Sequence, residues 1–225
     1  MPLLSEAMGL RSFVALPVSR GGSVFRLQYL VDTGSDPGIM FVNAALGLTG
    51  KDTLLFGLPY RVSPPDGGDR TGDFSALYRR TIWQDDQKYE TTRIALLTGV
   101  VLATDSNKDH ALQLGLVATF YRDRNSFDMD ALYRYGLDSR FNEGRYDVSW
   151  QYRLSPAEYP EWGFPTEWYT VLELNGRWRE GQTIDHQVTV GLQRVRHNWV
   201  LEGGIIQTIN NSHETQFLIS TRLRF

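Results

Sequence analysis

The chain has 225 residues, of which 41% are hydrophobic, 12% aromatic and 22% charged, with 21 glycines and no cysteine. Its formal net charge of -3 gives no basic excess, so we expect no nucleic-acid partner. Without cysteine, disulfides and thiolate metal sites are excluded. No run of about 18 apolar residues occurs, which excludes a transmembrane helix but not a membrane-spanning β-barrel.

Residues 1–22 precede the first regular pattern and form an N-terminal segment. Met1 to Leu10 lacks the basic start and long apolar core of a signal peptide. Phe13 to Val18 is a short apolar stretch that either adds a strand or folds into the interior as a plug. We therefore divide the chain into this segment and a barrel over residues 23–225.

From residue 23 onward, short runs alternate between apolar and polar side chains. Phe25, Leu27 and Tyr29 alternate with Arg26 and Gln28, and the pattern recurs along the chain. Successive side chains of a strand point to opposite faces, so each run predicts a strand with one apolar face. The predicted strands cover residues 23–33, 39–48, 53–63, 73–83, 89–103, 110–122, 126–136, 145–155, 167–178, 185–195, 199–209 and 215–225.

The last strand gives the clearest signal. Phe217, Ile219 and Leu223 lie on one face, Arg222 and Arg224 lie on the other, and Phe225 follows directly. A terminal aromatic residue on such a strand resembles the signal that is read by the outer-membrane barrel assembly machinery. We therefore predict Phe225 as the assembly signal and that machinery as a partner.

Alternation alone also fits a soluble β-sandwich, which buries its apolar face. The aromatic residues favour a barrel, because they lie toward strand ends on the apolar face, as interfacial girdles do. The predicted fold is an all-β, transmembrane, antiparallel up-and-down β-barrel of about 12 strands. We expect this barrel to lie in the bacterial outer membrane, with the lipid bilayer as its surroundings. The aromatic residues that carry this interpretation are Tyr60, Tyr78, Trp83, Trp150, Tyr152, Trp168, Trp178, Trp199 and Phe225.

Several segments resemble an outer-membrane family named for the MetA pathway of phenol degradation. The residues are Ala45 to Asp52 (ALGLTGKD), Leu54 to Arg61 (LLFGLPYR), Gly72 to Arg79 and Gly99 to Asp105. The hairpin tip at residues 103–106 reads ATDS and lacks the Pro and Gly of the family. The resemblance spans residues 23–225, carries no catalytic signature, and implies an outer-membrane barrel whose solutes are small, with a lean toward aromatic or hydrophobic compounds.

The polar face of each strand predicts the lining of the lumen. Charged side chains are expected there because Arg or Lys facing lipid at the midplane costs about 2–4 kcal/mol. These residues either set selectivity along an aqueous path or form an ion-pair network that seals it. The charged candidates are Arg26, Arg61, Arg79, Arg93, Asp128, Asp130, Arg134, Asp147, Arg153, Glu173, Arg177, Glu202, Arg222 and Arg224.

Catalytic and metal chemistry find little support. Asp32-Thr33-Gly34-Ser35 looks like an aspartic-protease turn, but a second such turn is missing and turn residues follow it. Ser149 and Ser220 are strand serines with no histidine of matching parity nearby. The four histidines have no metal-ligand spacing. We expect no enzyme, no metal and no cofactor.

The sequence therefore predicts an outer-membrane channel or transporter for a small-molecule solute. The main alternative is a non-conducting structural or assembly barrel with a sealed, ion-paired lumen, and a minor alternative is an outer-membrane hydrolase. Neither the transported compound nor the oligomeric state follows from the sequence pattern.

Overall fold

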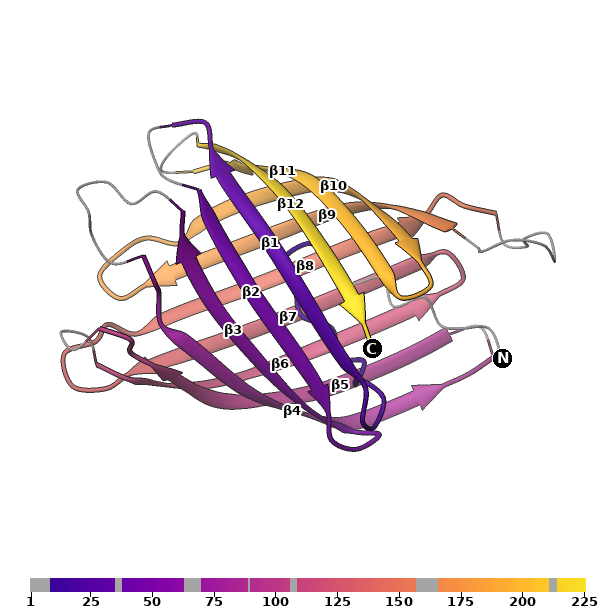
Figure 1. Cartoon of the computed structure of the whole chain (residues 1–225), viewed down its shortest axis with the longest axis horizontal. Helices are drawn as coiled ribbons and strands as arrows, with labels where there is room; N and C mark the ends of the chain where they lie inside the picture. The colour runs from indigo at the N-terminus through magenta and orange to yellow at the C-terminus, as the bar shows by residue number, and fades with distance from the viewer. Residues whose placement is uncertain are drawn as a thin grey trace.

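The computed structural model is a closed barrel of twelve antiparallel strands (Figure 1). It describes residues 9–34, 38–62, 70–88, 90–105, 109–156, 166–210 and 214–225. Each strand pairs with the next along the chain, and β1 pairs with β12 from Val24 opposite Arg224 to Asp32 opposite Gln216. The predicted twelve-stranded barrel is thus confirmed, and the open sandwich is excluded because the sheet closes on itself. No helix in the described part of the chain is long and apolar enough to cross a membrane.

The twelve strands follow the predicted ranges closely. They are β1 (Ser23–Asp32), β2 (Ile39–Gly47), β3 (Asp52–Arg61), β4 (Phe74–Asp86), β5 (Glu90–Leu102), β6 (Ala111–Arg122), β7 (Asn125–Gly136), β8 (Glu143–Arg153), β9 (Thr166–Arg179), β10 (Asp185–Arg196), β11 (Trp199–Thr208) and β12 (Thr215–Arg224).

The alternation seen in the sequence separates an outer from an inner surface. Outward side chains such as Leu114 and Ile219 are 58% and 56% exposed, whereas the inward Asp128 and Asp147 are fully buried. The register keeps this parity around the ring, so inward residues stand beside inward residues on every neighbouring strand. The exterior is therefore apolar and the interior carries the charge.

The two ends of the barrel differ in their connections. β1 begins and β12 ends at what we call the turn end, where β6–β7 and β10–β11 are joined by two-residue turns. Asp123 and His197 take positive φ values of 54° and 43° in these turns. The opposite end, the loop end, carries the connections after β1, β3, β5, β7, β9 and β11. The long β8–β9 connection breaks the rule at the turn end, and residues 157–165 of it lie outside the described residues.

β4 extends three residues beyond its predicted end at residue 83. Its register to β5 shifts between Thr81 and Trp83, where a β-bulge adds one residue. Such a bulge reverses the inward and outward parity of the residues that follow it. As a result Asp86 shares the inner face with Arg93 of β5, and the two form an ion pair of 2.9 Å.

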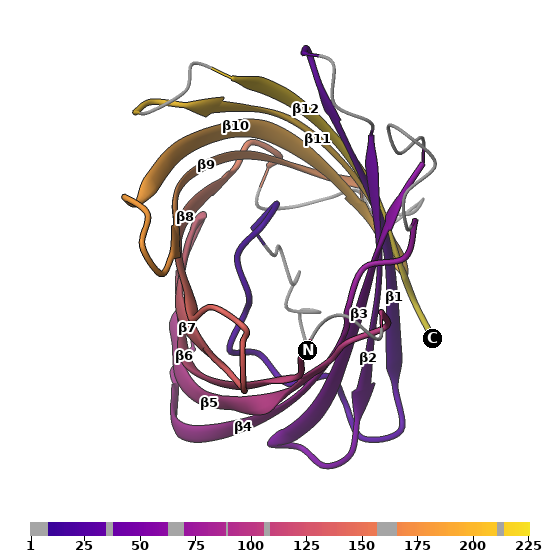
Figure 2. The same ribbon diagram turned by 90° about the vertical axis from the view of Figure 1, so that its left-hand side faces the viewer.

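Residues 9–22 form no strand, and residues 9–18 run through the inside of the barrel before the chain becomes exposed at residues 19–21 (Figure 2). Leu10, Ser12, Val14 and Ala15 are all at most 2% exposed. We call residues 9–18 the inner segment. It occupies the space that the strand alternation alone would leave to water.

Candidate functional site in the lumen

Inward carboxylates gather on three neighbouring strands. Asp128 and Asp130 of β7, Asp147 of β8 and Glu173 of β9 are at most 4% exposed, and we call this set the polar wall. Asp128 accepts hydrogen bonds from Thr119 Oγ1 (2.6 Å) and from the side-chain amide of Gln151 (2.7 Å). Buried carboxylates of this kind persist only when other polar groups compensate their lost hydration.

Two arginines on the loop-end side of the polar wall lie close to its carboxylates. Arg177 donates to Asp147 Oδ1 at 2.7 Å and to the carbonyl oxygens of Tyr146 and Gly176. Arg145, opposite Arg177 in the register, lies 3.6 Å from Asp130 and 3.8 Å from Asp147. These separations exceed hydrogen-bond length, so Arg145 is held by charge and keeps donor capacity.

A second charged cluster joins β11, β12 and β1. Glu202 is 1% exposed and pairs with the guanidinium groups of Arg26, at 2.7 Å, and Arg222. Arg26 Nε also donates to Ser220 Oγ at 3.0 Å. Because β1 and β12 carry the two ends of the barrel sheet, this cluster links strands that are remote in sequence at the closing seam.

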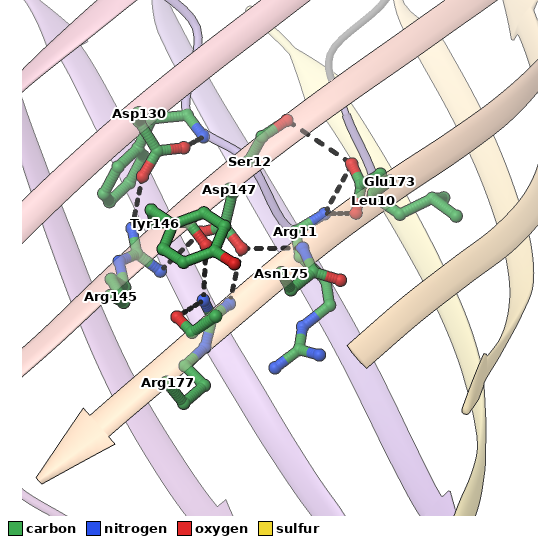
Figure 3. Close-up of polar contacts among 12 residues, drawn as sticks. Leu10, Arg11, Ser12, Asp130, Arg145, Tyr146, Asp147, Glu173, Asn175 and Arg177 are labelled. Carbon is green, nitrogen blue, oxygen red and sulfur yellow. Dashed lines mark hydrogen bonds and ion pairs between the residues drawn. The ribbon is translucent and has the colours of Figure 1, made fainter. Parts of the chain in front are cut away.

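The inner segment is held by side chains of the wall rather than by a strand ladder (Figure 3). The amide of Arg11 donates to Glu173 (3.1 Å), and the amide of Phe13 donates to Asp130 Oδ2 (2.7 Å). Arg26 and Arg79 donate in turn to the carbonyl oxygens of Leu10 and Val14. Buried backbone groups need such partners, so the polar residues of the lumen replace a neighbouring strand for this segment.

Apolar contacts fix the same segment at two points. Leu10 packs with Val171, Ile206 and Leu218. It sits against two glycines that face each other across β10 and β11: a Cβ on Gly191 or Gly204 would come within 2.5 and 2.9 Å of Leu10 Cδ1. The glycines thus leave the space that Leu10 fills.

The second point lies five residues further along the segment. Ala15 packs into a buried cluster on β4–β7, and Phe13 lies against the same cluster. We call the strand residues of this cluster the apolar wall: Leu77, Ala95, Leu97, Val117 and Leu132.

Two adjoining cavities remain between the inner segment and β1–β4. One has a volume of about 340 Å³ and is lined by Arg11, Arg26, Arg145 and Arg177 together with apolar side chains of β1–β3. The other, of about 320 Å³, extends toward Pro59 and Gln113. Phe13, Phe41, Asn43, Leu55 and Arg145 border both cavities.

The predicted lumen residues fall into two groups. One group lies at the barrel ends: Arg61 is exposed at the loop end, and Arg224 lies beside the C-terminus. In the same group, Arg93 pairs with Asp86, Arg134 lies 2.5 Å from Glu143, and Arg153 lies 3.5 Å from Glu167. The structure brings the others together in the middle of the lumen: Arg26, Arg79, Asp128, Asp130, Asp147, Glu173, Arg177, Glu202 and Arg222.

Sequence reasoning missed two arginines of the site. Arg145 has the same parity as Asp147 and stands at the first residue of its predicted strand, so the alternation was sufficient to find it. Arg11 had no such signal, because nothing in the irregular N-terminal pattern gives a direction to its side chain. Its Nη1 donates to Gln187 at 2.5 Å inside the barrel.

The protease-like turn has a structural role. Asp32 Oδ1 accepts a hydrogen bond from the Gly34 amide at 3.0 Å, as in an Asx turn at the loop end. Ser35 lies outside the described residues. Ser149 is buried on β8 beside Gln151, whose side-chain amide lies 3.4 Å from its hydroxyl.

Several solved outer-membrane proteins share this architecture. The KdgM porin superposes with a TM-score of 0.60 at 8% sequence identity, over 90% of this chain and 99% of that one. A KdgM porin in complex with disordered oligogalacturonate gives 0.53 at 10% identity, over 90% and 99%. An outer membrane channel from Pseudomonas putida F1 gives 0.57 at 13% identity, over 94% and 98%. At these identities the likeness shows a common fold. No protein-family model matches the sequence, and no curated protein matches it.

Proposed function

We propose that the chain is an outer-membrane channel for small molecules. The observation that carries the proposal is the inside-out distribution of side chains around a closed barrel. Large apolar residues such as Leu114, Val190 and Ile219 are at least half exposed, while the charged Asp128, Glu173 and Glu202 are buried inside. In water such an exterior would drive aggregation, whereas in lipid it is the stable arrangement.

Outward-facing aromatic side chains lie toward both ends of the barrel. Trp150, Trp168 and Trp199 face outward near the turn end, and Tyr133 and Trp178 stack at 6.3 Å near the loop end. Such residues prefer the two membrane interfaces. We place the turn end in the periplasm, as in barrels with short periplasmic turns. Phe225, 77% exposed at the end of β12, is then our candidate signal for the assembly machinery.

The structural neighbours support a channel in particular, since those with the fold in common include a porin and an outer membrane channel. Membership of the MetA-pathway family, with its lean toward aromatic or hydrophobic solutes, stays our prediction, as does the absence of catalysis. The two cavities beside the inner segment are the space that we assign to the solute.

A non-conducting barrel is the second candidate, and one observation favours it. The inner segment crosses the lumen and is fixed on both sides, by Glu173 and Asp130 and by the apolar wall. If these contacts persist in the membrane and the cavities do not connect the two ends, the barrel is a sealed structural element.

Bilayer recordings separate the two candidates. The refolded protein should migrate differently on gels before and after boiling, and then give stepwise conductance in planar bilayers. A bilayer that stays silent over many verified insertions would overturn the channel. A variant that lacks residues 1–18 is the companion measurement: conductance that appears only in this variant identifies the inner segment as a permanent plug.

A further inference from the structure

The larger cavity has two chemically different sides. Phe41 and Leu55 come from the inner faces of β2 and β3, where the register places them beside Gln28 and Leu77. Arg145 and Arg177 come from β8 and β9, and Arg11 comes from the inner segment. The inner faces of β2 and β3 therefore offer mainly aromatic and aliphatic carbon, whereas the rest of the lining is rich in guanidinium groups, to which Arg26, Arg79 and Arg222 also contribute.

The charge of the cationic side is directed into the cavity. No carboxylate is among the described residues that line it, because Asp130, Asp147 and Glu173 stand behind the arginines on the polar wall. The Nε and Nη2 atoms of Arg145 are buried without a hydrogen bond to the described residues, and the guanidinium lies over the Phe13 ring at 4.3 Å. The side chain as a whole is 26% exposed, so the remaining part of its charged head is accessible and can attract a carboxylate by charge and hydrogen bonding.

The apolar side restricts what accompanies the anionic group. A highly hydroxylated solute would place its hydroxyl groups against Phe41 and Leu55. Among the β2 and β3 residues that line both cavities, Asn43 has the polar side chain. A bare inorganic anion would leave this carbon surface wet. A cavity of about 340 Å³ is in the size range of small-molecule sites.

We propose that this cavity binds small organic carboxylates that carry an apolar body, with the carboxylate at Arg145 and the body against Phe41 and Leu55. The inference names the solute class of the channel proposed above and rests on that function for transport. Binding itself is a separate property of the folded barrel, so it is measured without reference to conductance.

Calorimetric titration of the full chain in detergent tests the proposal with three probes. Benzoate combines both features, benzamide keeps the ring without the charge, and acetate keeps the charge without the ring. We expect benzoate to bind at least ten-fold more tightly than either of the others. Equal affinity for benzamide would overturn the carboxylate assignment, and equal affinity for acetate would overturn the apolar one.

Variants locate the site. Arg145→Gln should weaken benzoate binding at least ten-fold, and Arg145→Lys should restore most of it by keeping the charge. Arg93→Gln is the matched control, because Arg93 pairs with Asp86 at the turn end and does not line the cavity. Heat-modifiable migration verifies that each variant is folded. Unchanged binding in a folded Arg145→Gln variant would place the site elsewhere and overturn the proposal.

The same experiments separate this proposal from the channel. Benzoate that binds to a barrel without conductance would refute the channel and leave the site standing. A conducting barrel that binds no benzoate would refute the site and leave the channel standing.

Discussion

The polar wall and the apolar wall face the same lumen but differ in chemistry: the first pairs buried charges, and the second packs carbon against carbon. On β7–β9 the inward residues are carboxylates with one to three polar partners each, such as Asp147 with Asn175 and Arg177. On β4–β6 they are Leu77, Ala95 and Leu97, which touch carbon. The two walls meet on β7, where Asp130 stands beside Val117 in the register and Leu132, two residues further on, belongs to the apolar wall.

The inner segment explains why one lumen has two kinds of wall. Its earlier part, Arg11 and Ser12, bonds to Glu173, and its later part packs Ala15 on the apolar wall. The interior is thus not lined for water alone: each wall matches the part of the segment that it holds. This comparison makes distinct predictions about what happens when either wall is damaged.

The largest effect is expected from breaking the polar wall. Asp147→Ala removes a fully buried carboxylate from between Arg177 and Arg145, whose side chains are each only 26% exposed. Removal of one partner from a buried ion pair costs about 3–5 kcal/mol, so urea unfolding in lipid vesicles should show a loss of this size. Asp86→Ala removes a carboxylate from the more exposed pair with Arg93 and should cost at most about 1 kcal/mol. Similar losses in the two variants would show that the polar wall is not tightly coupled.

A smaller loss should follow from opening the apolar wall. Leu97 is fully buried, and Leu97→Ala leaves a cavity against Ala15 and Val117. Buried Leu→Ala changes cost about 2–5 kcal/mol, and we expect the lower half of that range because the adjoining segment can shift. Leu112→Ala, on the outer face and 50% exposed, is the control and should cost less, since no internal cavity forms. In the same unfolding assay, the loss in the free energy of unfolding should be largest for Asp147→Ala, smaller for Leu97→Ala and smallest for Leu112→Ala. This order tests the comparison as a whole.

The third prediction concerns the segment rather than the walls. Leu10→Ala removes the side chain that packs against Gly191 and Gly204. It should weaken the docking of the segment while the strand ladder stays intact. A loss of about 1.4 kcal/mol in docking raises the undocked population ten-fold, so single-channel records should show a larger or more frequently open state. Leu192→Ala changes the neighbour of Gly191 that points outward, at 49% exposure, and should leave the records unchanged. An unaltered Leu10→Ala record would mean that the segment does not limit conduction.

The strand pattern and the walls differ in how far the sequence alone predicts them. Strands are readable because lipid on one side and a polar interior on the other impose a period of two, as in Phe217 to Arg224. That period gives direction and so also identifies Asp128, Glu173 and Glu202 as inward. It does not say which inward residues meet, because the pairing of Arg26 with Glu202 depends on closure between β1 and β12.

The contacts of the inner segment were beyond such reasoning for a further reason. Some of them join residues more than 100 positions apart, such as Phe13 with Asp130 and Arg11 with Glu173. The backbone of the segment has no periodic conformation from which the direction of a side chain follows. The inward glycines Gly191 and Gly204 make room for the segment. Without the register, however, a glycine in a strand indicates only a position that weakens the strand.

The smallest effect is expected outside the walls, at the loop end. Asp109 accepts hydrogen bonds from the Ser139 amide (3.0 Å) and hydroxyl (2.5 Å), and these bonds hold the pKa of its carboxyl below the usual value. A lowered folded-state pKa means that the contribution to stability is present above the unfolded-state pKa and is lost as the pH falls through the folded-state value. Hydrogen exchange at Ser139, corrected for its intrinsic pH dependence, should therefore show protection at neutral pH that declines in acid. Asp109→Asn should flatten this dependence and leave both walls unchanged, and a loop that keeps its acid-sensitive protection in the variant would refute the assignment to Asp109.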